Sequence, residues 1–152
     1  ACMKIGAILG DGSQNEILHL GKLGRCLGII MELRKDFHVS LNLSLELKQR
    51  IVNKALPFSV VWASEHSIAL KRKLEVVPVE ENEPTYVKQI VKDILDVATS
   101  EHILKIIQKA SRAGVTALSR LGINNKSTQT LQSFVEAQPE LFVESLANIE
   151  AD

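Results

Sequence analysis

Apolar residues recur at helical spacing along most of this chain. From Gln14 to Phe37 they fall three or four residues apart, as expected for one buried face of a helix. The members of this set are Ile17, Leu18, Leu20, Leu23, Leu27, Ile30, Met31 and Leu33. Similar stripes run from Tyr86 to Ala98, from Ile103 to Leu121 and from Leu131 to Ala137. The pattern predicts an all-α fold, an antiparallel helical bundle.

A turn cluster and the end of the apolar pattern mark the two ends of the first long helix. Residues 11–15 form a turn cluster, and Ser13 or Asn15 is a suitable N-cap before Glu16. The apolar pattern runs out near Phe37, and residues 39–42 read as the exit from the helix. The turn cluster therefore separates this helix from a short apolar segment that begins at the first residue.

The later boundaries follow from proline, glycine and hydroxyl residues. Ser44 is a candidate cap for a helix from Leu45 onward, and Pro57 predicts a kink or break in it. Residues 71–84 are rich in charge and proline and are predicted to be a loop, with Pro84 opening the next helix. Gly122 stands where a helix C-terminus favours glycine. Pro139 opens a last helix.

Composition limits the class of protein. At 152 residues the chain fits one domain, 1–152, and 45% hydrophobic residues with only 4% aromatics favour a helical core over a β-sandwich. Eighteen basic and eighteen acidic residues give a formal net charge of zero, which offers no electrostatic footprint for nucleic acid. No apolar run reaches the roughly 18 residues that span a bilayer. We expect a soluble, cytoplasmic protein without a membrane span.

Three glycines share one face of the first long helix with a charged cluster. Gly21, Gly24 and Gly28 lie three and four residues apart. The same helical spacing places Glu32, Lys35, Asp36 and Val39 on this face. Each glycine costs about 1 kcal/mol relative to alanine inside a helix, so a run of them needs a reason. One explanation is close approach by a neighbouring helix or a ligand chain, and the other is that some of these glycines lie in a loop before the helix begins.

The order of these residues resembles the second aspartate-rich region of the trans-isoprenyl diphosphate synthases, or polyprenyl synthetases. That family reads G-x-x-L-G, then F-Q, then D-D-x-x-D. Gly24, Leu27 and Gly28 match, Glu32 stands at the glutamine position, and residues 35–39 occupy the acidic motif. Within that motif only Asp36 keeps its carboxylate.

The resemblance continues on both sides of the motif. Residues 2–10 are similar to the family's A-C-x-x-G-A-x-L-G segment, and residues 53–63 resemble K-x-T-L-P-x-x-x-A, with Asn53 at the lysine position and Lys54 one residue later. The glycine- and lysine-rich loop of many members is replaced, as in shorter members that carry E-E-F-x-D. The resemblance implies that the chain is the C-terminal part of a longer protein whose N-terminal half holds the first aspartate motif.

In this family Mg²⁺ bridges an allylic diphosphate to two carboxylate clusters that face each other across a helical bundle. The resemblance implies the C-terminal half of the isoprenoid synthase fold, prenyl diphosphate substrates, Mg²⁺ as cofactor and a homodimer. The implied metal ligands are Asp36 and Glu32, which we expect to face an apolar cleft. The implied diphosphate contacts are Lys35, Arg34, Arg50 and Lys54. No other catalytic residue is assigned.

Three interpretations follow. The first is a prenyltransferase that condenses isopentenyl diphosphate with an allylic diphosphate, active only with the N-terminal half. The second is a degenerate homologue that acts as a structural or regulatory partner, which Lys35, Val39 and Asn53 favour. The third is an unrelated bundle. Residues 92–96, K-D-I-L-D, look like the acidic motif but lack a preceding glycine face, and we interpret them as an ordinary helix surface.

Overall fold

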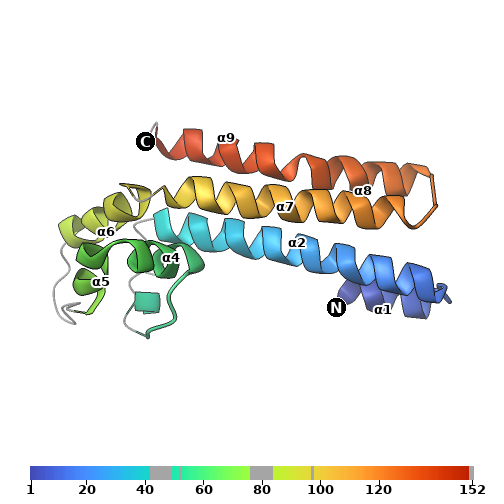
Figure 1. The fold of residues 1–152 in the computed structure, drawn as a ribbon, viewed down its shortest axis with the longest axis horizontal. Coiled ribbons are helices and arrows are strands. Elements are labelled where there is room, and N and C mark those ends of the chain that lie inside the picture. The colour runs from blue at the N-terminus through green and yellow to red at the C-terminus, as the bar shows by residue number, and fades with distance from the viewer. Residues whose placement is uncertain (42–48, 52, 76–83, 97, 151–152) are drawn as a thin grey trace. The chain divides into compact units, whose positions relative to one another are not determined.

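Helices account for all the regular structure in the residues that the computed structural model describes, namely 1–41, 49–51, 53–75, 84–96 and 98–150 (Figure 1). The helices are α1 (Cys2–Leu9), α2 (Gln14–Leu41), α4 (Phe58–His66), α5 (Ile68–Glu75), α6 (Pro84–Asp96), α7 (Thr99–Ser119), α8 (Lys126–Glu136) and α9 (Gln138–Glu150). Residues 49–51 are helical too. The predicted all-α class is confirmed.

The chain divides into two compact units, and the divisions fall inside helices α2 and α7. Unit 1 contains Ala1–Glu32 and Leu104–Asp152, and unit 2 contains Leu33–Ile103. Each unit has its own apolar core.

Unit 1 is built on the glycine face of α2. The Cβ of Met3 lies 3.3 Å from where a Cβ on Gly24 would be, and the side chain of Lys4 lies 3.7 Å from the same point on Gly21. These two glycines therefore admit the antiparallel helix α1, which confirms close helix packing for them. A Cβ on Gly28 would meet nothing within 4 Å.

Helix α7 makes a second close approach in unit 1. A Cβ on Gly114 would lie 3.1 Å from Val135 of α8 and 3.4 Å from Leu23 of α2. The buried Ser111 hydroxyl donates to the carbonyl of Val135 at 2.8 Å. The lack of a side chain at Gly114 thus lets α2, α7 and α8 share one core, whose buried members are Leu23, Ala117, Leu118 and Val135.

Local signals set the ends of the helices in unit 1. Ser13 and Glu16 form a capping box, since the Ser13 amide donates to the Glu16 carboxylate at 2.7 Å and the Glu16 amide donates to the Ser13 hydroxyl at 3.3 Å. Ser13, one of the two predicted caps, is therefore the N-cap of α2. Gly122 has φ +68°, as predicted for a residue that ends a helix. Helix α8 begins with a capping box of Asn125 and Thr128.

Unit 2 packs α4, α5 and α6 against the end of α2. Its buried core consists of Val39, Ile51, Val60, Ala63, Leu70, Ile90 and Ile94. Pro57 lies in a break before α4, as predicted, and Pro84 is the first residue of α6, also as predicted. Val39 is only 7% exposed and is a core residue, so it does not extend the charged face of α2.

One predicted boundary is wrong. Residues 71–75 belong to α5 and are not a loop, because Leu70 is fully buried and Leu74 packs against the same core. Helix α2 ends at Leu41, within the predicted exit at residues 39–42. The predicted cap at Ser44, the helix start at Leu45 and the loop at 76–83 lie outside the described residues. Among the described helices, none has the length and apolarity needed to cross a membrane.

Candidate functional site

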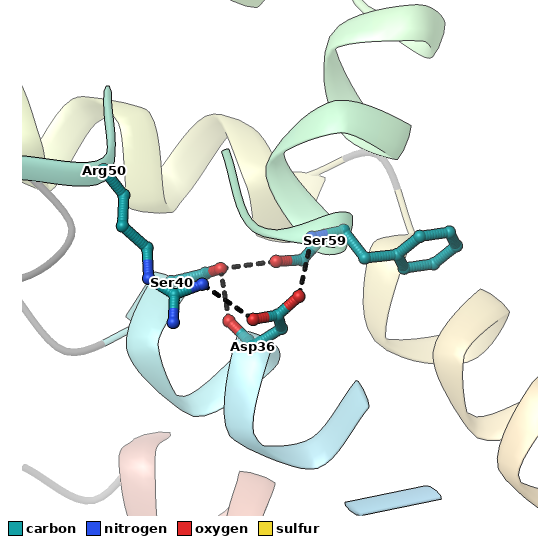
Figure 2. Close-up of polar contacts among 5 residues, drawn as sticks. Asp36, Ser40, Arg50 and Ser59 are labelled. Atoms are coloured by element: carbon teal, nitrogen blue, oxygen red, sulfur yellow. Dashed lines mark hydrogen bonds and ion pairs between the residues drawn. The ribbon is translucent and has the colours of Figure 1, made fainter. Parts of the chain in front are cut away.

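Asp36 is the aspartate that the sequence predicts as a metal ligand, and two groups bind it within unit 2 (Figure 2). The Arg50 guanidinium donates from Nη1 to Oδ1 of Asp36 at 2.9 Å. The backbone N–H of Phe58 donates to Oδ2 at 3.2 Å. The side chains of Asp36 and Arg50 are 15% and 24% exposed. This half-buried carboxylate is therefore oriented through both of its oxygens.

Two buried serines form hydrogen bonds next to Asp36. The Ser40 hydroxyl donates to the backbone carbonyl of Asp36 at 2.7 Å and shares a hydrogen bond with the Ser59 hydroxyl (Figure 2). Both serines are fully buried. The pair joins the end of α2 to the first turn of α4 and satisfies polar groups that would be costly to bury alone.

The residue before α4 explains why the N-terminus of this helix binds Asp36. Its N-cap is Pro57, which makes no side-chain hydrogen bond to the helix. The first N–H groups of a helix have no partner within the helix and favour a nearby acid. Asp36 accepts the first of them and so acts as a cap supplied from α2.

Arg50 is positioned by a helical end that follows it. The amide of Ala55 donates to the Arg50 carbonyl at 2.9 Å, and the amide of Lys54 donates to Ile51 at 3.0 Å. Lys54 has φ +53°. This is the Schellman pattern, in which a left-handed residue closes the helix. A lysine holds the position that glycine usually takes.

Four aromatic rings, three from α4 and one from α7, stack on one another. Phe58, Trp62 and His66 recur every four residues along α4, and His102 of α7 stacks on two of them. The ring centroids of Trp62 and His66 are 4.1 Å apart, those of Trp62 and His102 are 4.5 Å apart, and those of Phe58 and His102 are 6.3 Å apart. These stacks hold the helix whose N-terminus contacts Asp36.

Of the six predicted site residues, the structure brings Asp36 and Arg50 into contact. Glu32 is exposed and belongs to unit 1. Lys35 and Lys54 have exposed side chains, and Arg34 is half-buried. The sequence reasoning missed Ser40, Ser59 and the amide of Phe58. The proline before α4 was the available signal, because a helix without its own capping side chain needs an acceptor from elsewhere.

The similar motif at residues 92–96 contains a second aspartate with a cation. Asp93 accepts from the Lys73 ammonium at 2.5 Å and from the Gln89 amide at 3.0 Å. Burial raises the pKa of Asp93, but the hydrogen bonds from Lys73 and Gln89 and the charges of Lys73 and Lys92 outweigh burial and leave that pKa below its ordinary value. Asp93 thus joins α5 to α6, and it offers a matched control for Asp36.

The side chains available as metal ligands decide whether Asp36 could bind Mg²⁺ within this chain. The described part of the chain contains no cluster of three or more histidine, cysteine or acidic side chains that could hold a metal. A carboxylate has about four lone-pair positions, and Mg²⁺ commonly takes one or two carboxylates together with waters and phosphate oxygens. The described residues therefore provide no metal site made of protein ligands alone.

Comparisons of the chain with protein-family models, with curated proteins and with solved structures found no match.

Proposed function

We propose that this chain takes part in isoprenoid biosynthesis as part of a prenyltransferase, and that it supplies the diphosphate side of the site. The site of Asp36, Arg50 and the N-terminus of α4 supports this proposal most directly. A guanidinium and a helix N-terminus both bind phosphate groups, and the carboxylate between them suits a shared Mg²⁺. The run of resemblance from Cys2 to Ala63 gives the reaction class.

The reaction would join isopentenyl diphosphate to an allylic diphosphate. The allylic C–O bond breaks, diphosphate leaves with the bonding electrons, a carbon–carbon bond forms to isopentenyl diphosphate, and a proton is lost from the new product. When bound, Mg²⁺ supplies charge neutralisation for the leaving diphosphate. In this chain, Asp36 would hold that ion, and Arg50 would bind a diphosphate oxygen through its planar fork of donors.

A second candidate function is a catalytically degenerate partner subunit. Three observations favour it: Asp36 is already ion-paired, Lys35 stands at the first acidic position, and Val39 is buried in the core. In this case the fold would be kept for assembly with an active subunit, and Asp36 would be kept as a cap of α4.

One assay separates the two functions. The full-length polypeptide is incubated with Mg²⁺, isopentenyl diphosphate and an allylic diphosphate, and both prenyl product and released diphosphate are measured. The prenyltransferase predicts product that is lost in Asp36→Asn and kept in Asp93→Ala, which removes a comparable half-buried ion pair in unit 2. A folded wild-type protein that forms no product would refute it and leave the partner subunit.

A further inference from the structure

Charges of opposite sign are separated onto neighbouring helices of unit 1. The basic residues that α7 contributes to this unit share one side of the helix, and they are Lys105, Lys109 and Arg112. The acidic residues of α8 and α9 recur every four residues, and the described ones with exposed side chains are Glu136, Glu140 and Glu144. No acidic residue lies between 104 and 119, and no basic residue follows Lys126. The surface therefore carries a basic stripe on α7 and an acidic stripe on α8 and α9, although the formal net charge of the chain is zero.

Both stripes face solvent without a charged partner. All six side chains are exposed, and none forms an ion pair with another residue in the described part of the chain. Leu141 and Val143 lie within the acidic stripe and are 37% and 46% exposed. Exposed apolar side chains that are bordered by charge are typical of a protein interaction surface, and the sign of the charge selects the partner.

The two stripes also lie at the same height along their helices. Helix α7 and the pair α8 and α9 are antiparallel neighbours (Figure 1), and the hydrogen bond from the Ser111 hydroxyl to the Val135 carbonyl aligns them. Counting along both helices from this hydrogen bond brings each lysine of the basic stripe within one residue of a glutamate of the acidic stripe, which is about 1.5 Å along the axis. The matched pairs are Lys109 with Glu136 and Lys105 with Glu140.

We propose that these stripes form the contact between two copies of this chain. A two-fold axis parallel to the helices places α7 of each copy against α8 and α9 of the other, so that each lysine of a matched pair lies opposite the glutamate at its own height. Such an interface is isologous, and every contact in it occurs twice. Leu141 follows Glu140 directly and is covered with it. The proposal depends on charge, exposure and register, and it is independent of prenyl transfer.

Sedimentation velocity of the full-length polypeptide tests the proposal. The wild type should dimerise, and its Kd should rise on the order of tenfold between about 50 mM and about 500 mM NaCl, because salt screens exposed charges. The basic-reversed variant, Lys105→Glu with Lys109→Glu, should raise the Kd on the order of a hundredfold, because like charges then meet at every matched pair. The acid-reversed variant, Glu136→Lys with Glu140→Lys, should raise it by a similar factor for the same reason.

A mixture of the two reversed variants makes the test specific for these stripes. In the mixture each acidic stripe again meets a basic one, so a mixed dimer should form with a Kd within about threefold of the wild-type value. The matched control is Lys71→Glu with Arg72→Glu, which changes the net charge as much as the basic-reversed variant does but alters exposed residues of α5. The control should dimerise like the wild type, and it should not restore a dimer when it is mixed with the acid-reversed variant.

The outcomes that overturn the proposal are distinct. A wild type that stays monomeric, a dimer that neither reversal weakens, a mixture of reversed variants that stays monomeric, or a control that loses the dimer each overturns it. Circular dichroism shows whether each variant is folded. Should a reversed variant fail to fold, Lys105→Gln with Lys109→Gln replaces it, and an unchanged Kd in this neutral variant overturns the proposal as well.

Discussion

Replacing Asp36 by alanine should destabilise unit 2 by removing two interactions at once. The N–H of Phe58 loses its cap, and losing a capping side chain costs about 1 kcal/mol. Arg50 loses its partner in an ion pair that is partly exposed, which contributes up to about 1 kcal/mol. The free energy of unfolding should therefore fall by about 2 kcal/mol. At this chain length that corresponds to a drop in Tm of about 4–8 °C.

Two further variants separate the cap from the ion pair. Asp36→Asn keeps an oxygen that can accept from Phe58 but removes the charge, so it should cost about half as much as Asp36→Ala. Asp93→Ala removes an ion pair of similar exposure that caps no helix, and it should cost no more than about 1 kcal/mol. Urea and thermal denaturation followed by circular dichroism give the values. Equal losses in Asp36→Ala and Asp93→Ala would refute the capping role.

Three other predictions concern helix ends. Lys54→Gly should raise the free energy of unfolding by about 0.5–1 kcal/mol in urea denaturation, because φ is +53° there; a loss would contradict the left-handed cap. Gly12→Ala should lower it by more than about 1 kcal/mol, since the new Cβ would lie 2.8 Å from the carbonyl oxygen of Ala7; unchanged stability would contradict this contact. Hydrogen bonds from Ser13 hold the pKa of Glu16 below its ordinary value, so this capping box stabilises the protein above the ordinary carboxyl pKa and is lost as the pH falls through the lowered value. An NMR titration should show Ser13→Ala bringing that pKa back toward its ordinary value.

Local features of this fold could be predicted from sequence because they depend on near neighbours. The period of apolar residues gave the all-α class, since a helix repeats every 3.6 residues. Ser13 caps α2 through Glu16, three residues later, and Gly122 takes a positive φ in the turn that follows α7. Pro57 interrupts the helical pattern because it has no backbone N–H to donate.

The contacts of the site could not be predicted, because they join distant positions. Arg50 and Phe58 lie 14 and 22 residues after Asp36, and no spacing rule relates them. The loop predicted at residues 71–75 failed for the same reason. Composition suggested a loop, but Lys73 pairs with Asp93, 20 residues later, and tertiary contacts of this kind override local preference.

The carboxylate of Asp36 and a diphosphate would compete for the same two donors, and this competition gives one last prediction. Without a divalent cation, Asp36→Ala should bind inorganic diphosphate several-fold more tightly than wild type, because Arg50 and the N-terminus of α4 are then released from their internal anion. With Mg²⁺ present, the same variant should bind diphosphate more weakly than wild type, because Asp36 would no longer hold the shared ion. A purely structural aspartate predicts the first change without the second. Weaker binding of diphosphate under both conditions would contradict the anion competition itself.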